Sequence, residues 1–209
     1  MSARVRAKIC GVTNEEDARA AIDLGADALG FNLWPGSKRH IDLDRESSWI
    51  HGLPPFVARV AVLVNVPLDE ARRVAGHPAI DLVQFHGDED ASYCAAFAEG
   101  GRPFIKAMRV PDAASLESAP RFSTPHVLLD AAAGGAYGGT GTRLDPSLAA
   151  EAVRRFPDLK IILAGGLTPE NVGEAVRAVR PYAVDVASGV ESEPGRKDRA
   201  KLERFLAAI

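Results

Sequence analysis

Two side chains capable of proton transfer stand at the ends of two short apolar runs. Cys10 closes the run Val5–Ile9, and Asp130 closes the run Val127–Leu129. A thiolate can act as a general base and a carboxylic acid as a general acid. If both runs are parallel strands of one barrel, the two groups face each other across the same opening. The pair therefore suggests proton-transfer chemistry that uses neither a metal ion nor a redox cofactor.

Each of these residues also has an ordinary structural interpretation. Most free cysteines are small buried hydrophobes, and an aspartate at a strand end can cap a helix or pair with a cation. From position alone, catalytic and structural roles are equally consistent with Cys10 and with Asp130. For Cys94, inside an expected helix, the structural role is favoured. The sequence shows no export signal, so we expect free thiols and a cytoplasmic protein.

The elements that must position these groups follow a regular pattern. Apolar runs recur at intervals of about 20–30 residues, which is typical of repeated strand–helix units. Helix signals such as Asp145-Pro146 and Thr168-Pro169 separate many of them. The pattern favours an α/β protein with a single (β/α)8 TIM barrel over residues 1–209, ahead of an open doubly wound sheet. The expected strands are Val5–Ile9, Ala28–Phe31, Val57–Val64, Ile80–Phe85, Phe104–Met108, Val127–Leu129, Ile161–Ala164 and Ala183–Val186.

Alternation along each strand predicts which side chains face the barrel interior. We assign the polar residues to the inward set, which turns Val60 and Ile105 toward the helices. An interior of that polarity needs internal pairing or a bound ligand. Reacting groups of such barrels lie at the carboxyl ends of the strands. The predicted inward polar residues are Lys8, Cys10, Arg59, Gln84, His86, Lys106, Asp130 and Asp185.

Glycine-bearing loops follow the last two expected strands. Gly165-Gly166 follows the seventh, and Ser188-Gly189 follows the eighth. Backbone N–H groups in such loops bind phosphate in many barrels. One Gly-Gly pair can be only a turn, but two such loops at these places favour a phosphate cradle. A third Gly-rich stretch, Ala131–Thr142, directly follows Asp130.

Two further residues could bind an anionic or polar substrate. Arg39, after the second expected strand, could hold a carboxylate through two parallel hydrogen bonds, although a solvated loop charge is the usual alternative. His86 is equally consistent with a substrate contact and with an ordinary hydrogen-bonded histidine.

The composition excludes several classes of function. The chain has 209 residues, 46% of them hydrophobic, which suffices for one barrel-sized core. A net charge of −3 gives no basic footprint for nucleic acid, and no apolar stretch is long enough to span a bilayer. The five histidines form no cluster with ligand spacing, so we predict no metal site.

In their order along the chain, the motifs resemble those of the phosphoribosylanthranilate isomerase family of tryptophan biosynthesis. The similarity runs nearly the whole length of the chain. Frequent family residues are replaced at Phe85, Ala187 and Leu144–Pro146, none of which is the proposed acid or base. The motifs that carry the resemblance are Lys8–Asn14, Gly25–Phe31, Pro35–Arg39, Val83–Gly87, Tyr137–Gly141, Gly165–Val172 and Val184–Glu191.

The resemblance implies a cofactor-free (β/α)8 barrel that acts on a phosphosugar. The implied reaction is the Amadori rearrangement of N-(5-phosphoribosyl)anthranilate to 1-(2-carboxyphenylamino)-1-deoxyribulose 5-phosphate. Matched position by position, Cys10 is the general base and Asp130 the general acid. The implied substrate-binding residues are Arg39 for the anthranilate carboxylate, His86 and Asp185 for other contacts, and Gly165, Gly166, Ser188 and Gly189 in the phosphate-binding loops.

Two other functions fit the same residues. One is a Schiff-base sugar-phosphate aldolase that uses Lys106, and the other is a non-catalytic phosphosugar-binding barrel. A metal-dependent epimerase is disfavoured by the number and placement of the histidines. We expect a monomer or a homodimer, with no nucleic-acid or membrane partner.

Overall fold

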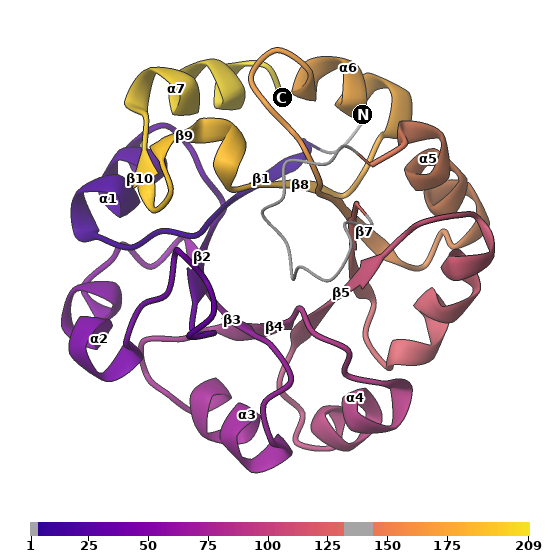
Figure 1. Cartoon of the computed structure of the whole chain (residues 1–209), viewed down its shortest axis with the longest axis horizontal. Coiled ribbons are helices and arrows are strands. Elements are labelled where there is room, and N and C mark those ends of the chain that lie inside the picture. The colour runs from indigo at the N-terminus through magenta and orange to yellow at the C-terminus, as the bar shows by residue number, and fades with distance from the viewer. Residues whose placement is uncertain (1–3, 132–143) are drawn as a thin grey trace.

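Eight parallel strands close into one barrel in the computed structural model, which describes residues 4–131 and 144–209 (Figure 1). Neighbouring strands pair in chain order, and the last strand pairs with the first. All eight predicted strands are present, so the predicted (β/α)8 fold is confirmed. The strands are β1 Arg6–Cys10, β2 Ala28–Asn32, β3 Ala58–Leu63, β4 Leu82–Phe85, β5 Phe104–Arg109, β6 His126–Asp130, β7 Lys160–Leu163 and β8 Ala183–Val186.

Helices form the outer ring around the barrel (Figure 1). The segment after β5 is a 3₁₀ helix, η1, which contains Pro120; proline lacks the N–H that a continuous α-helix needs. The helices are α1 Glu15–Asp23, α2 Leu43–His51, α3 Leu68–Ala75, α4 Ala91–Ala98, η1 Ala114–Phe122, α5 Pro146–Arg155, α6 Val172–Val179 and α7 Arg199–Ala207.

Of the two helix starts predicted from Asp-Pro and Thr-Pro, the first is confirmed and the second is wrong. Asp145 caps α5 by accepting a hydrogen bond from the N–H of Ser147, and Pro146 stands at the first helical position, as predicted. Thr168 does not cap α6, which begins only at Val172. The carbonyl of Thr168 accepts from the N–H groups of Asn171 and Val172, so Thr168-Pro169 forms a turn before the helix.

A small hairpin interrupts the path from β8 to α7. It follows a short 3₁₀ helix, η2 Ser188–Val190, and consists of β9 Glu191–Glu193 and β10 Arg196–Lys197. In Figure 1 the hairpin lies beside β1 and α1, over the side where the barrel closes.

The apolar core has two layers. The larger layer packs between the barrel and the helices and includes Ile9, Phe85 and Leu129. The smaller layer fills the barrel itself. Its fully or nearly buried members are Val60, Ile105, Ala107, Leu128, Ile162, Ala164 and Ala183.

The predicted strand phase is wrong in β3 and β5. Val60 and Ile105 lie inside the barrel, so Arg59 and Lys106 face the helices instead. The register agrees, because Arg59 is paired with Leu29, a member of the outer layer. In both strands each face is mainly apolar and one face also carries a charge, Arg59 or Lys106, so alternation alone did not say which face is inward. The two charges are satisfied outside the barrel, Arg59 by Asp81 and Lys106 by Glu89.

In β1, β4, β6 and β8 the predicted phase is confirmed. Their outward residues belong to the layer under the helices, and Leu128 and Ala183 belong to the barrel interior. The inward polar set therefore keeps Lys8, Cys10, Asp130 and their neighbours on these four strands and loses only Arg59 and Lys106.

Candidate active site

Cys10 ends β1 at the carboxyl-terminal mouth of the barrel. It is half-buried and free of any disulfide. Two residues earlier, the ammonium of Lys8 lies 2.6 Å from a carboxylate oxygen of Asp185, and both side chains are almost fully buried. This ion pair joins β1 to β8 directly beneath the thiol.

A glycine on the neighbouring strand makes room for the thiol. Gly30 is paired with Cys10 across β1 and β2. A Cβ atom at Gly30 would lie 2.8 Å from the Cys10 sulfur and 3.0 Å from the Lys8 nitrogen. A larger residue at this position would require one of these two groups to move, so glycine leaves the space that both occupy.

Charges around Cys10 act on its ionisation in opposite directions. Burial raises the pKa of the Cys10 thiol, and Asp185 raises it further, whereas Lys8 and Lys197 oppose the shift. Burial alone would lower the pKa of Lys8, but Asp185 and Cys10 raise it to about 12. Lys8 is therefore a fixed cation at neutral pH, and its charge favours the thiolate form of Cys10.

Asp130 ends β6 at the same mouth, and one of its oxygens lies 3.2 Å from Nε2 of His86. The other ring nitrogen of His86 lies 2.8 Å from the side-chain nitrogen of Gln84, which is fully buried. With Gln84 donating to Nδ1, the ring proton is on Nε2 and is donated to Asp130. In the same arrangement the Gln84 carbonyl oxygen is buried with no hydrogen-bond partner among the residues that the structure describes.

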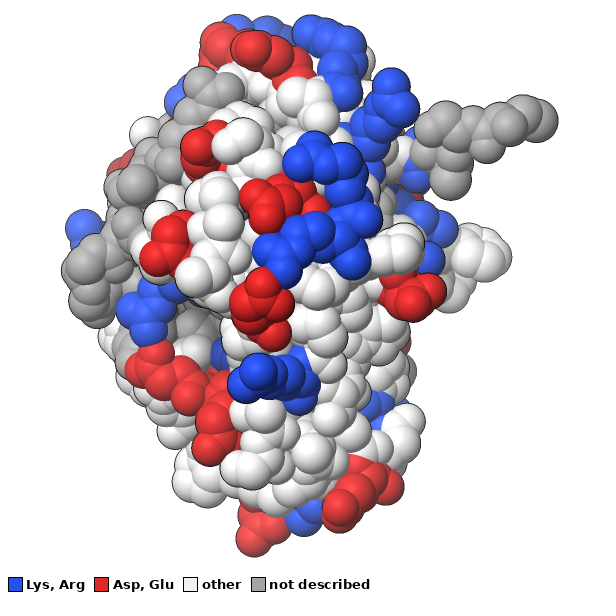
Figure 2. Space-filling model, turned by 90° about the vertical axis from the view of Figure 1, so that its right-hand side faces the viewer, with Lys and Arg blue, Asp and Glu red and all other residues white. Residues whose placement is uncertain are grey.

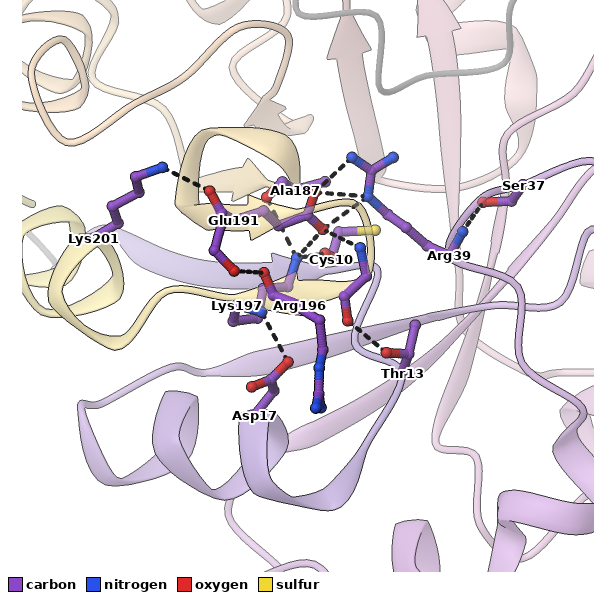
Figure 3. A network of polar contacts seen from close by, with 12 residues as sticks. Cys10, Thr13, Asp17, Ser37, Arg39, Ala187, Glu191, Arg196, Lys197 and Lys201 are labelled. Atoms are coloured by element: carbon purple, nitrogen blue, oxygen red, sulfur yellow. Dashed lines mark hydrogen bonds and ion pairs between the residues drawn. The ribbon is translucent and has the colours of Figure 1, made fainter.

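Arg39 already holds a carboxylate, which belongs to the chain itself. Its Nε and Nη2 atoms donate to the two oxygens of Glu191 at 2.8 and 2.6 Å (Figure 3). Glu191 also accepts from Lys197 at 2.8 Å. Burial opposes the charge of Glu191, yet Arg39 and Lys197 hold its pKa below the usual range. The sequence predicted a bidentate arginine but did not reveal this internal partner.

The two predicted glycine loops come together beside Asp130. A Cβ atom at Gly189 would lie 1.9 Å from the carbonyl oxygen of Leu167, so η2 contacts the loop after β7 at a distance that only glycine allows. Gly165 and Gly166 both have positive φ angles. A Cβ atom at Gly165 would lie 3.0 Å from a carboxylate oxygen of Asp130, which places this loop next to the candidate acid.

A cavity opens next to the His86–Asp130 pair. Its volume is about 470 Å³, and its lining includes His86, Asp130, Met108 and Arg121. Most of the Gly-rich loop Ala131–Thr142, including the motif Tyr137–Gly141, lies outside the described residues.

A family model for N-(5'-phosphoribosyl)anthranilate (PRA) isomerase matches residues 7–208. The chain belongs to this family. The N-(5'-phosphoribosyl)anthranilate isomerase of Geobacter metallireducens is 50% identical to this chain over 97% of each chain. That of Neisseria meningitidis strain FAM18 is 47% identical over 98% of this chain and 96% of its own.

Solved PRA isomerase structures have the same fold. The Thermotoga maritima enzyme superposes with a TM-score of 0.87 at 39% identity over 98% of each chain. A PRA isomerase in complex with reduced 1-(o-carboxyphenylamino)-1-deoxyribulose 5-phosphate gives a TM-score of 0.85 at 39% identity, again over 98% of each chain. Sequence and fold therefore give the same family over almost the whole chain.

The structure does not favour the aldolase alternative. Lys106 lies outside the barrel interior, 2.9 Å from Glu89 and 2.8 Å from the carbonyl of Gly87. A Schiff-base lysine needs a free, uncharged amine that the substrate can reach, and this ammonium is buried in an ion pair.

Two charged residues of this PRA isomerase family member were not among the predicted site residues. Glu191 and Lys197 both lie in the hairpin after β8. Glu191 accepts from Arg39, and Lys197 donates to the carbonyl of Cys10. Glu191 stood at the end of a family motif, but nothing local marks Lys197 as buried. Its position depends on a hairpin that folds back over β1.

Three negative findings apply only to the described parts of the chain. In residues 4–131 and 144–209, no three His, Cys, Asp or Glu side chains are placed to hold a metal ion. None of the helices seen in these ranges could cross a membrane. On the face shown in Figure 2, the upper area where Lys and Arg side chains lie together is not purely basic, because Asp and Glu side chains lie beside them.

Proposed function

We propose that this protein catalyses the Amadori rearrangement of N-(5-phosphoribosyl)anthranilate to 1-(2-carboxyphenylamino)-1-deoxyribulose 5-phosphate in tryptophan biosynthesis. The family match over residues 7–208 carries the proposal. The reaction is an internal exchange of oxidation level, in which the sugar C1 becomes a methylene and C2 a ketone. Protons alone are transferred, so a suitably placed acid and base suffice.

Asp130 acts as the general acid. In its protonated form it donates a proton to the furanose ring oxygen, and the C1–O bond breaks to give an open-chain Schiff base between C1 and the anthranilate nitrogen. The hydrogen bond with His86 at 3.2 Å fixes one oxygen of Asp130 and leaves the carboxyl group at the mouth. His86, which lines the cavity beside Asp130, is also assigned as a substrate contact.

Cys10 acts as the general base. As a thiolate it removes the proton from the sugar C2. The C2–H electron pair forms the C1–C2 double bond, and the pair of the C1–N double bond moves to the iminium nitrogen and neutralises it. The resulting enolamine loses the C2 hydroxyl proton and gains a proton at C1, which gives the aminoketose. Lys8 stabilises the thiolate, and its ion pair with Asp185 at 2.6 Å keeps the ammonium in place.

Two anchors hold the substrate at opposite ends. The backbone N–H groups around Gly166, Ser188 and Gly189 bind the phosphate, with Gly165 providing the turn. The carboxylate of anthranilate binds to the Nη1–Nη2 edge of Arg39. Glu191 occupies the other edge, through Nε and Nη2, and so orients the guanidinium. Fixed ends convert the proton transfers into reactions between positioned groups.

A fluorescence assay tests the proposed function. Phosphoribosylanthranilate is generated in situ from anthranilate, and its loss of fluorescence is followed when the purified protein is added. We expect an acceleration of many orders of magnitude over the spontaneous rearrangement. A rate equal to the spontaneous one, with folded protein, would sink the proposal.

A non-catalytic phosphosugar-binding barrel is the second candidate. It would need the glycine loops but neither the thiol nor the carboxyl group at the mouth. Binding of the reduced product analogue without turnover would support this candidate instead.

The oligomeric state is part of the proposal at the level of a monomer or a homodimer. Solved relatives include monomeric variants of the dimeric Thermotoga maritima protein. Within the described residues, Phe56 is the large apolar side chain left most exposed, at 98%, and it borders a cavity of about 550 Å³ at the amino-terminal end of the barrel. Sedimentation velocity of the wild type and of Phe56→Ser decides whether this end of the barrel associates. We also propose that the enzyme acts in the cytoplasm.

A further inference from the structure

Lys197 in β10 is a buried cation directly behind the thiol-bearing residue. Its side chain is 0% exposed. The ammonium donates to the carbonyl of Cys10 at 2.6 Å, to that of Ala187 at 3.3 Å and to the Glu191 carboxylate at 2.8 Å (Figure 3). One side chain thus joins the ends of β1 and β8 to the hairpin.

The hairpin is built to deliver this lysine. The N–H of Lys197 donates to Asp17 in α1 at 2.8 Å, and the hydroxyl of Thr13 donates to the carbonyl of Gly195 at 2.6 Å. On the other side, Lys201 donates to the carbonyl of Glu191 at 2.7 Å. These contacts fix the hairpin against the β1 side of the mouth.

Packing alone does not explain a lysine at this position. Burial lowers the pKa of Lys197, while the Glu191 carboxylate opposes that shift. A buried ion pair is commonly no more stabilising than well-packed apolar residues of similar volume. The contacts of Lys197 instead place its charge where a negative charge on the neighbouring thiol would benefit from it.

Four charged groups from four elements act on Cys10 or are affected by it. They are Lys8 in β1, Asp185 in β8, Arg39 after β2 and Lys197 in β10. Lys8 is paired with Asp185, and Arg39 is paired with Glu191. Lys197 is the one of these cations that also bonds to the backbone of Cys10 itself.

We propose that Lys197 is a positioning residue for the general base: it fixes the carbonyl of Cys10 and supplies a second cation that stabilises the Cys10 thiolate. Glu191 is shared between Lys197 and Arg39, so the same network links the base to the carboxylate anchor. The role in turnover depends on the proposed function, whereas the effect on the thiol does not.

The test compares Lys197→Met, Lys197→Gln and a matched control, Lys201→Met. Lys201 also holds the hairpin through Glu191 but does not contact Cys10. The rate of alkylation of Cys10 by iodoacetamide is measured against pH, with the modified cysteine identified by mass spectrometry. Values of kcat and KM are measured in parallel, and circular dichroism checks the fold.

We expect Lys197→Met to move the midpoint of Cys10 alkylation upward by roughly one pH unit. We also expect a fall of at least tenfold in kcat with little change in KM, and no change of either kind in Lys201→Met. Lys197→Gln keeps a hydrogen-bond donor without the charge, so an upward shift there assigns the effect to the charge. If Lys197→Met does not fold, Lys197→Gln provides the measurement.

Two results would overturn the proposal. In one, the alkylation profiles of folded Lys197→Met and Lys197→Gln coincide with that of the wild type. In the other, Lys201→Met shifts the profile as much as Lys197→Met, which would assign the effect to the hairpin as a whole. A wild type without turnover but with the expected alkylation shift would reject the proposed function and leave this proposal standing.

Discussion

At the scale of single residues, the proposed site pairs a thiol with a carboxyl group, and their surroundings differ in kind. Cys10 has cations nearby, and burial opposes its ionisation. Asp130 has Nε2 of His86 beside one oxygen and accepts from the N–H of Ala131 with the other. In the proposed mechanism the thiol beside the cations takes a proton and the carboxyl group gives one.

Removal of either group should abolish most of the turnover. We expect Cys10→Ala and Asp130→Asn each to lower kcat by about 10²–10⁴-fold, the usual contribution of a positioned acid or base. Thermal unfolding should remain close to that of the wild type, because both residues lie at the mouth and not in the core.

Cys94→Ala is the control for Cys10→Ala. Cys94 is a fully buried residue of α4 that the proposed mechanism does not use, so this variant should keep its turnover. Near-normal turnover of Cys10→Ala or Asp130→Asn would remove that residue from the mechanism.

At the scale of elements, close approach between neighbouring strands and helices decides which residues fit. Gly30 on β2 faces the thiol of β1, and Gly189 in η2 touches the loop after β7. Each lets two functional elements come nearer than any side chain would allow. The positions of these glycines are therefore part of the proposed site although neither has a side chain.

Gly30→Ala should damage the site more than the fold. The added methyl would lie 2.8 Å from the Cys10 sulfur, so the thiol must move. We expect a loss of kcat of tenfold or more and a destabilisation of about 1–3 kcal/mol from overpacking, measured by steady-state kinetics and urea unfolding.

Gly76→Ala provides the comparison for Gly30→Ala. A Cβ at Gly76 would be 3.5 Å from its nearest neighbours, an ordinary contact, and its φ is −83°. This variant should retain its turnover. Equal kinetics for the two variants would show that Gly30 does not position the thiol.

The second cysteine gives an element-scale prediction about pH. Burial in α4 raises the pKa of Cys94 from 9.0 to about 11. The unfolded chain loses this proton first as the pH rises, so the stabilisation is complete below pH 9 and is lost between 9 and 11.

Urea unfolding between pH 8 and 11 checks this expectation. The unfolding free energy of the wild type should fall more steeply than that of Cys94→Ala across this range. Parallel curves for the two proteins would contradict it.

At the scale of the whole molecule, ring closure depends on contacts between the two ends of the chain. β1 and β8 pair directly, and the Lys8–Asp185 ion pair lies across that seam, 177 residues apart in sequence. Lys197 crosses the same seam from the hairpin. The closing strands thus hold both the thiol and the charges that act on it.

Breaking the buried pair at the seam should destabilise the whole barrel. Lys8→Met leaves the Asp185 carboxylate uncompensated and should cost about 3–5 kcal/mol of unfolding free energy. The double variant Lys8→Met/Asp185→Leu should recover most of that loss, because neither charge is then left unpaired. Both values come from urea unfolding at neutral pH.

An exposed ion pair serves as the comparison for the seam. Arg73 and Glu70 on α3 are largely exposed, so Arg73→Ala should change the unfolding free energy by less than about 1 kcal/mol. A cost of Lys8→Met no larger than this would show that the seam pair does not hold the ring closed.

Local patterns in the sequence were enough to predict the eight strands, the Asp145 cap and the placing of Cys10 and Asp130 at one mouth. Apolar runs and capping residues act over a few positions, and parallel strands of a barrel bring their carboxyl ends together whatever the details. The family motifs then supplied the reaction and the residues expected to perform it.

Only the tertiary structure decided the phase of β3 and β5, the internal partner of Arg39 and the burial of Lys197. In the two strands both faces are mainly apolar, and the charges of Arg59 and Lys106 can be satisfied either inside the barrel or under the helices. Arg39 meets Glu191 from 152 positions away, and Lys197 meets Cys10 from 187 positions away. Such contacts depend on how the ring closes and how the hairpin folds across it, and no local sequence pattern carries that information.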